Sequence, residues 1–149
     1  MNLLVGLDHS TESTRAFEYA LDIAEATGGS IMALHVIDPT VLEIFESEPI
    51  TTFSDAEERL IVENIEDAET RGNDLLDAAV ERASARSIEL DPVMLYGDPI
   101  YLLTTYGTEE DIDTIVVGHT GMSPRVEHLV GSVAKGVVEW ATVPVTVVR

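Results

Sequence analysis

The sequence predicts an α/β fold in which helices cover a parallel sheet. Short apolar runs alternate with longer amphipathic stretches along the chain, which is the pattern of strands connected by crossover helices. A length of 149 residues is that of one domain, able to bury a core without metals or disulfides. Cysteine is absent, which excludes a disulfide framework, a thiol nucleophile and a zinc–thiolate site.

The first part of the chain predicts a strand, a helix, a second strand and a long helix. Ser10 is the expected N-cap of the first helix, and Gly28-Gly29 ends it. Apolar side chains at helical spacing mark one buried face on each helix. Residues 39–53 show no clear periodicity, and connections of this length are often functional lids or mobile loops. The four expected elements are residues 2–7, 11–27, 30–37 and 54–87.

The second part of the chain predicts three strands and two helices. Asp98 and Pro99 provide an N-cap and a first-turn proline for a short helix. The last helix is expected to begin near Leu129. The strands are residues 89–95, 114–117 and 144–148. The buried face of the last helix is expected to consist of Val133, Ala134, Val137, Val138 and Ala141.

A glycine-rich segment lies between the apolar run 114–117 and the last helix. Gly118, Gly121, Gly131 and Ser132 follow the spacing G-x2-G-x9-G-S. Glycine lets backbone N–H groups approach a polyphosphate, and the first turn of a helix offers unpaired N–H donors and a positive dipole end. Neither a Walker loop nor a G-x-G-x-x-G dinucleotide fingerprint occurs in the chain.

This glycine spacing, together with several other segments, resembles the universal stress protein family and specifically its ATP-binding branch. Each segment is weak evidence alone, whereas their common order and intervals are strong evidence. The resemblance covers essentially the whole chain and rests on residues 3–8, 33–38, 97–99, 118–133 and 143–148.

The resemblance implies a single-domain, open, five-stranded parallel sheet of order 3-2-1-4-5 with helices on both faces. It also implies a ligand, ATP or a related adenine nucleotide together with Mg²⁺, and a homodimer formed through the last strand. In open α/β sheets ligands bind beyond the carboxyl ends of the strands where the strand order reverses. Here that point lies after the first and fourth expected strands.

Ten ligand-contacting residues are implied by the resemblance, in four groups. Those at the end of the first strand line the nucleotide, with Asp8 at the ribose or the metal–phosphate end. One residue at the end of the second strand packs on adenine, two at the end of the fourth strand border the nucleoside, and the others contact phosphates or ribose. In this order they are Gly6, Leu7 and Asp8; Val36; Val117 and Gly118; and Gly121, Gly131, Ser132 and Val133.

Several of these residues also have a purely structural interpretation. Gly6 could relieve crowding in a buried strand, Asp8 could cap the first helix, and Val36 belongs to the core in either case. Gly131 at a helix start costs about 1 kcal/mol relative to alanine. That cost is reasonable if a phosphate must come close, and the segment as a whole therefore favours ligand binding.

The four histidines fall near strand ends or in the glycine-rich segment. Imidazole is a common metal ligand, but no two of them have a spacing such as H-x3-H, and His35 lies within an apolar strand. The sequence instead favours His119 and His128, with Arg125, as donors of hydrogen bonds and positive charge near phosphate. The fourth histidine is His9.

The charge of the chain is strongly acidic. Its 28 acidic and eight basic residues give a formal net charge of −20, and Lys135 is the only lysine. Such a domain repels nucleic acid, because no basic stripe neutralises phosphates. One interpretation is an ordinary acidic protein. The scarcity of lysine favours adaptation to a salt-rich cytoplasm, where the Debye length falls to about 3 Å near 1 M salt.

No apolar run has the length of a membrane span, and a short strand rather than a basic leader opens the sequence, so we expect a cytoplasmic protein. The function that the sequence favours is that of an ATP-binding, homodimeric regulatory domain with little or slow ATP hydrolysis. The alternative is a dimeric interaction module in the stress response that does not bind nucleotide. No nucleophile with an adjacent general base is evident, and no catalytic residue is assigned.

Overall fold

A computed structural model of the chain describes residues 1–39, 55–120 and 130–149. Within these residues five strands form one parallel sheet of order β3-β2-β1-β4-β5. The fold class and strand order expected above are therefore confirmed. Gly121, Arg125, His128 and nearly all of the 39–53 connection lie outside the described residues. The strands are β1 (Asn2–Gly6), β2 (Ser30–Ile37), β3 (Glu89–Tyr96), β4 (Thr114–Gly118) and β5 (Val145–Val148).

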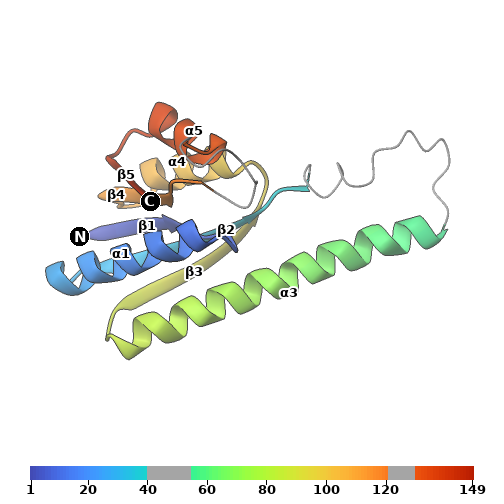
Figure 1. Cartoon of the computed structure of the whole chain (residues 1–149), viewed down its shortest axis with the longest axis horizontal. Helices are drawn as coiled ribbons and strands as arrows, with labels where there is room; N and C mark the ends of the chain where they lie inside the picture. Colours follow the sequence, from blue (N-terminus) through green and yellow to red (C-terminus); the bar gives the residue numbers. More distant parts are fainter. Residues whose placement is uncertain (40–54, 121–129) are drawn as a thin grey trace.

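Helices cover both faces of the sheet (Figure 1). One face carries α1 (Thr11–Thr27) and α3 (Asp55–Ala85), and the other carries α4 (Pro99–Glu109) and α5 (Ser132–Trp140). Each face has its own apolar core because successive strand residues point to opposite sides. Along β1, Leu3 and Val5 join the core under α1 and α3, whereas Leu4 joins the core under α4 and α5. No helix of the described segments is long and apolar enough to cross a membrane.

The ends of α1 agree with the sequence prediction. The Ser10 hydroxyl accepts a hydrogen bond from the Ser13 N–H at 3.1 Å, which caps the first turn. Gly28 ends the helix with φ 65°, a left-handed conformation that glycine adopts without strain, and its N–H donates to the carbonyl of Ala24. The polypeptide then returns directly into β2, which pairs with β1.

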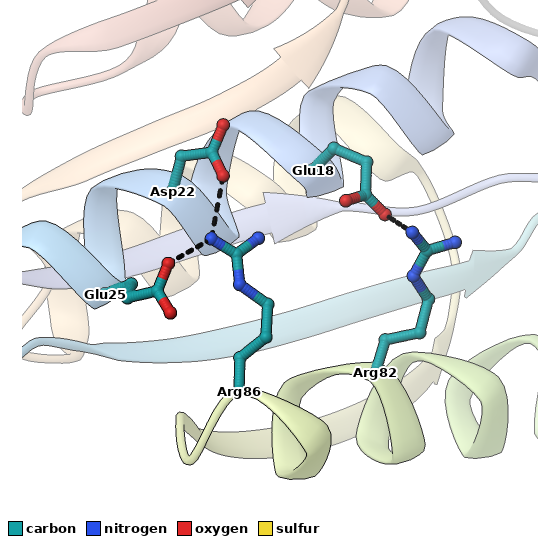
Figure 2. A network of polar contacts seen from close by, with 5 residues as sticks. All are labelled: Glu18, Asp22, Glu25, Arg82 and Arg86. Atoms are coloured by element: carbon teal, nitrogen blue, oxygen red, sulfur yellow. Dashed lines mark hydrogen bonds and ion pairs between the residues drawn. The ribbon is translucent and has the colours of Figure 1, made fainter.

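Ion pairs connect α3 to α1 near the C-terminal end of α3 (Figure 2). Arg82 pairs with Glu18, and Arg86, directly after the helix, contacts Asp22 at 2.8 Å and also Glu25. Hydrogen bonds from Arg86 to Glu25 and Asp22 raise the pKa of its guanidinium, so this group remains charged at any relevant pH. These contacts hold the two helices side by side on one face of the sheet.

The last helix differs from its prediction in two ways. It begins at Ser132 rather than near Leu129, because Gly131 is extended (φ −63°, ψ 159°) and serves as the N-cap. Ala134 and Val137 are buried as expected, but Val138 is 56% exposed, and its assignment to the buried face was wrong. In a nine-residue helix that meets the core through positions 134 and 137, position 138 is rotated by a further 100° towards solvent.

Candidate functional site

A cleft of about 430 Å³ opens at the carboxyl end of the sheet. It lies where β1 has β2 on one side and β4 on the other, which is the point of strand-order reversal. The structure brings together at this cleft every predicted site residue that it describes. These lining residues are Gly6, Leu7, Asp8, Val36, Val117, Gly118, Gly131, Ser132 and Val133.

The loop after β1 is held by hydrogen bonds around Asp8. Its Oδ1 accepts from the Ser10 N–H at 2.8 Å and from the Ser10 hydroxyl, and its own N–H donates to the Ser13 hydroxyl at 2.9 Å. Ser10, not Asp8, caps α1, so the interpretation of Asp8 as a mere helix cap was wrong. Within the described residues Oδ2 of Asp8 accepts no hydrogen bond, which leaves one carboxylate oxygen for a ligand at the cleft wall.

Two glycines at the cleft permit close approaches. A Cβ atom on Gly118 would lie 2.8 Å from the carbonyl carbon of Glu12, so the missing side chain lets the first turn of α1 pack against the end of β4. A Cβ atom on Gly6 would lie 3.3 Å from Leu103 Cδ1. Gly6 therefore does relieve crowding against α4, and at the same time it lines the cleft.

The N-terminus of α5 forms one end of the cleft. The Gly131 N–H donates to the carbonyl of His119 at 2.8 Å, and Gly131 offers no side-chain cap. In the described part of the chain, the N–H groups of Ser132, Val133 and Ala134 find no acceptor. These donors and the positive end of the helix dipole can receive an anion. Gly131 itself contributes space rather than a donor.

The walls of the cleft differ in polarity. Apolar side chains from β2, β4, α4 and α5 line one wall and offer a surface to a flat apolar group. Polar side chains from the β1–α1 loop, the first turn of α1, the end of β2 and α3 line the other wall. The apolar residues include Leu34, Val36, Leu103, Val117, Val133 and Ala134, and the polar ones include Asp8, His9, Ser13, His35, Asp38 and Arg71.

His9 and His35 lie together on the polar wall, with ring centroids 5.6 Å apart in an edge-to-face arrangement. His35 is buried, and its Nδ1 lies 2.8 Å from the Leu7 carbonyl oxygen, so Nδ1 carries a proton and donates it. Burial and the positive charge of His35 and Arg71 lower the pKa of His9, although Asp8 raises it. The other described histidine, His119, is buried outside this lining, and its backbone N–H donates to the Val148 carbonyl.

Sequence reasoning missed several lining residues, among them Ser13, Arg71 and Thr120. Ser13 follows Asp8 by five positions and could have been found as a partner of the loop backbone. Arg71 carries no signal of this kind, because it lies within a long amphipathic helix far from every motif. No group of three or more His, Asp or Glu side chains able to hold a metal ion occurs in the described ranges.

A second hollow of about 550 Å³ lies on the outer side of α4. It contains none of the predicted site residues, and its walls come mainly from one helix face together with Trp140 at the end of α5. Residues from separate segments converge on the first cleft, whereas neighbouring turns of one helix line this second hollow. The first cleft is therefore the candidate site.

The fold and the cleft define a small doubly wound α/β domain with an open site at its strand-order reversal. Within that class, the chain belongs to the universal stress protein family, whose model matches residues 1–149. Universal stress protein Rv1636 of Mycobacterium tuberculosis (strain H37Rv) is 31% identical over 151 residues, covering 99% of this chain and 94% of that protein. The solved structure of UspA from Lactobacillus plantarum superposes with a TM-score of 0.78 at 28% identity, covering 100% of this chain and 97% of that one.

Some solved structures with this fold contain an adenine nucleotide. A family member from Arabidopsis thaliana has AMP bound (TM-score 0.69, 20% identity, 99% of this chain and 90% of that one). One from Archaeoglobus fulgidus is in complex with dAMP (TM-score 0.64, 20% identity, 100% and 98%). At these identities the likeness to this chain concerns the fold.

Proposed function

We propose that this chain is a nucleotide-binding regulatory domain that takes up ATP with Mg²⁺ and forms a homodimer through β5. The observation that carries the proposal is the convergence on one cleft of residues from four separate segments, all of which were expected from the sequence alone. These segments are 6–8, 36, 117–118 and 131–133.

The chemistry of the cleft suits a nucleotide. The α5 N-terminus offers N–H donors for phosphates, the middle of the cleft offers the Asp8 carboxylate, and Val36 and Leu103 belong to the apolar wall. Mg²⁺ in such sites is usually bound by phosphate oxygens, water and one or two carboxylates. Oδ2 of Asp8 fits that requirement, and when bound the ion would neutralise phosphate charge. The AMP and dAMP in related structures give independent support for an adenine ligand.

Hydrolysis of ATP is expected to be slow or absent. Phosphoryl transfer needs cations and donors that stabilise the charge developing on the transferred group. The described lining contains no lysine and one arginine, Arg71, which lies on the wall formed by α3 rather than at the α5 N-terminus. Binding that reports on the cell's nucleotide state agrees better with this lining than turnover does.

Gly131→Val tests the site directly. The backbone at position 131 (φ −63°, ψ 159°) is one that valine adopts readily, so the sheet should fold, while the added side chain blocks the approach to the α5 donors. We expect calorimetry with Mg·ATP to show at least about a tenfold loss of affinity, equivalent to 1.4 kcal/mol. Unchanged ATP affinity in a variant with a normal thermal melt would contradict the proposed site.

A search for co-purified nucleotide distinguishes this proposal from a dimeric interaction module that does not bind nucleotide. Purified protein would be mildly denatured and the released material analysed by chromatography at 260 nm, where we expect an adenine nucleotide. We also expect Mg·ATP to bind more tightly than AMP, since the donors at α5 serve phosphates and the cation offsets repulsion from the acidic surface. Absence of nucleotide, together with no binding of ATP, ADP or AMP, would favour the interaction module.

A further inference from the structure

Of the arginines on or directly after α3, Arg71, Arg82 and Arg86 differ in what their guanidinium groups contact. Arg82 and Arg86 pair with acidic side chains of α1 (Figure 2). Arg71 lines the cleft and makes no ion pair or hydrogen bond with any residue of the described segments. The chain has 28 acidic residues, yet Arg71 forms no ion pair with any described carboxylate. Its position at the cleft makes it a candidate for contact with a ligand.

Close packing at Gly72 brings Arg71 to the cleft. A Cβ atom on Gly72 would lie 2.8 Å from His35 Cδ2 and 2.9 Å from Met94 Sδ. Glycine inside a helix costs about 1 kcal/mol relative to alanine, and here it lets α3 approach β2 and β3. The residue next to Gly72 is thereby held at the carboxyl edge of the sheet, beside His35.

The cleft lining around Arg71 carries groups of both charges, two histidines and two carboxylates. Its positive charge contributes to the lowered pKa of His9, which places the two groups within electrostatic range of each other. His35 packs against His9 on the same wall. Asp8 and Asp38 also line the cleft, but Oδ1 of Asp8 is held by Ser10. The wall around Arg71 therefore presents donors and planar rings to a ligand.

Arg71 and the α5 N-terminus lie at opposite ends of the cleft. α3 packs on β2 and β3, whereas α5 packs on α4 and β5, and β1 lies between these two sets of strands. The two helices also cover opposite faces of the sheet (Figure 1). A nucleotide whose phosphates occupy the uncapped N–H groups of α5 can extend its base towards the β2 end, where Val36 and Arg71 both line the cleft.

We propose that Arg71 is a specificity-determining residue that holds the purine base of the bound nucleotide. The inference rests on the proposed function and names a contact for the end of the ligand that lies away from the phosphates. A guanidinium is planar, stacks on the face of a base and donates hydrogen bonds to ring nitrogens. A lysine ammonium has the same charge but no planar face.

Two variants of Arg71 and one matched control test the contact. Arg71→Ala removes both the plane and the charge, and Arg71→Lys removes only the plane. The control, Arg15→Ala, removes the same charge from an exposed position of α1 that does not line the cleft. Calorimetry would measure Mg·ATP and inorganic tripolyphosphate, with adenosine measured by competition against ATP, and thermal melts without ligand would verify the fold of each variant.

We expect ATP and adenosine affinity to fall about tenfold in both Arg71 variants, as for the loss of a stacked, hydrogen-bonded cation. The affinity of Arg15→Ala for ATP and adenosine should stay within about twofold of wild type. The affinity of every variant for tripolyphosphate should stay within the same limit. If Arg71→Lys restores ATP affinity, if tripolyphosphate loses affinity equally, or if Arg71→Ala changes nothing, the proposal is wrong. Wild-type protein that binds no adenine nucleotide at all would instead contradict the proposed function itself.

Discussion

At the scale of single residues, the end of β1 is the most constrained part of the cleft. Asp8 is fixed by Ser10 and Ser13, and the Leu7 carbonyl accepts a hydrogen bond from His35. These contacts orient the loop before any ligand arrives, which reduces the entropy that binding must overcome. Asp8 was predictable because it ends an apolar strand in a recognisable motif. Arg71 was not, because only the packing of α3 on β2 places it there.

Removal of the Arg71 charge should raise the pKa of His9. Burial is the largest cause of the lowered pKa, followed by the positive charge of His35 and then that of Arg71. In Arg71→Ala the last of these is lost, so His9 should take up its proton at a higher pH than in wild type. A titration of the His9 ring signals by NMR in both proteins measures this change. Identical titration curves would show that Arg71 is too far from His9 to act on it.

The lowered pKa of His9 also makes stability depend on pH. The unfolded chain, with a histidine pKa of about 6.5, takes up a proton before the folded protein does. The free energy of unfolding therefore decreases as the pH falls below about 6.5, until the pH has also passed the folded pKa. We expect wild type to lose more thermal stability than His9→Asn between about pH 7.5 and about pH 5.5. All other titratable groups are present in both proteins, so equal losses would contradict this account.

At the scale of elements, α3 is positioned by two different kinds of contact. Ion pairs bind its C-terminal end to α1, and Gly72 closes it onto β2 and β3 near the cleft. Exposed ion pairs contribute little stability and weaken in salt. Close packing at Gly72 does not depend on salt, so we infer that it is the more important contact for the geometry of the site.

Gly72→Ala should destabilise the protein although alanine is the better helix former. The change gains about 1 kcal/mol of helix propensity, but its Cβ would displace the His35 ring and Met94, at a typical overpacking cost of about 1–3 kcal/mol. We expect a net loss of stability of about 1 kcal/mol in chemical denaturation and weaker ATP binding. Ser84→Ala, at an exposed position of the same helix, is the matched control and should not destabilise. A more stable Gly72→Ala variant would show that the ring moves aside at no cost.

Element boundaries were predictable where a local signal specifies them. Ser10 and Gly28 gave the ends of α1, and Asp98 with Pro99 gave the start of α4. The start of α5 was not predictable, because Gly131 is both a potential helix residue and an N-cap, and only its backbone conformation distinguishes the two. Exposure of Val138 was missed for a different reason. Positions 134, 137 and 138 share helical spacing, and only the packing of α5 shows that the core meets the helix through 134 and 137.

At the scale of the whole molecule, net charge and the open sheet edges determine how copies of the chain behave in solution. With a formal charge of −20, the folded state repels itself at low salt. Thermal stability should rise with potassium chloride into the molar range, because screening reduces repulsion and salting-out strengthens apolar burial. The surface ion pairs of Arg82 and Arg86 act in the opposite direction but are few. A thermal unfolding midpoint that stays constant or falls as potassium chloride is added would indicate an ordinary acidic protein without salt adaptation.

The edge formed by β5 has the features of a pairing surface. Among the described residues, β5 pairs only with β4, and the backbone N–H groups of Ile115 and His119 donate to the carbonyls of Pro144 and Val148. The backbone groups of the alternate residues, Val145 and Val147, must therefore point to the open edge. Pro144 precedes the strand, and its carbonyl accepts from Ile115 of β4, so this proline does not protect the open edge. Val145, Thr146, Val147 and Val148 carry no charge that would discourage a partner.

We predict a homodimer in which two β5 strands pair antiparallel about a two-fold axis. Val147→Lys should shift it towards monomer, but Val147 also packs against the core under α4 and α5, so that variant could weaken the fold as well. Val147→Pro is the sharper test, because it removes an outward N–H, keeps an uncharged apolar side chain against the core, and is tolerated at a sheet edge. Light scattering at micromolar protein and molar salt should find a dimer for wild type and a monomer for Val147→Pro. The thermal unfolding midpoint of the variant should be near that of wild type. A monomeric wild type under these conditions would exclude the β5 interface, and a dimeric Val147→Pro would place the dimer contact elsewhere on the molecule.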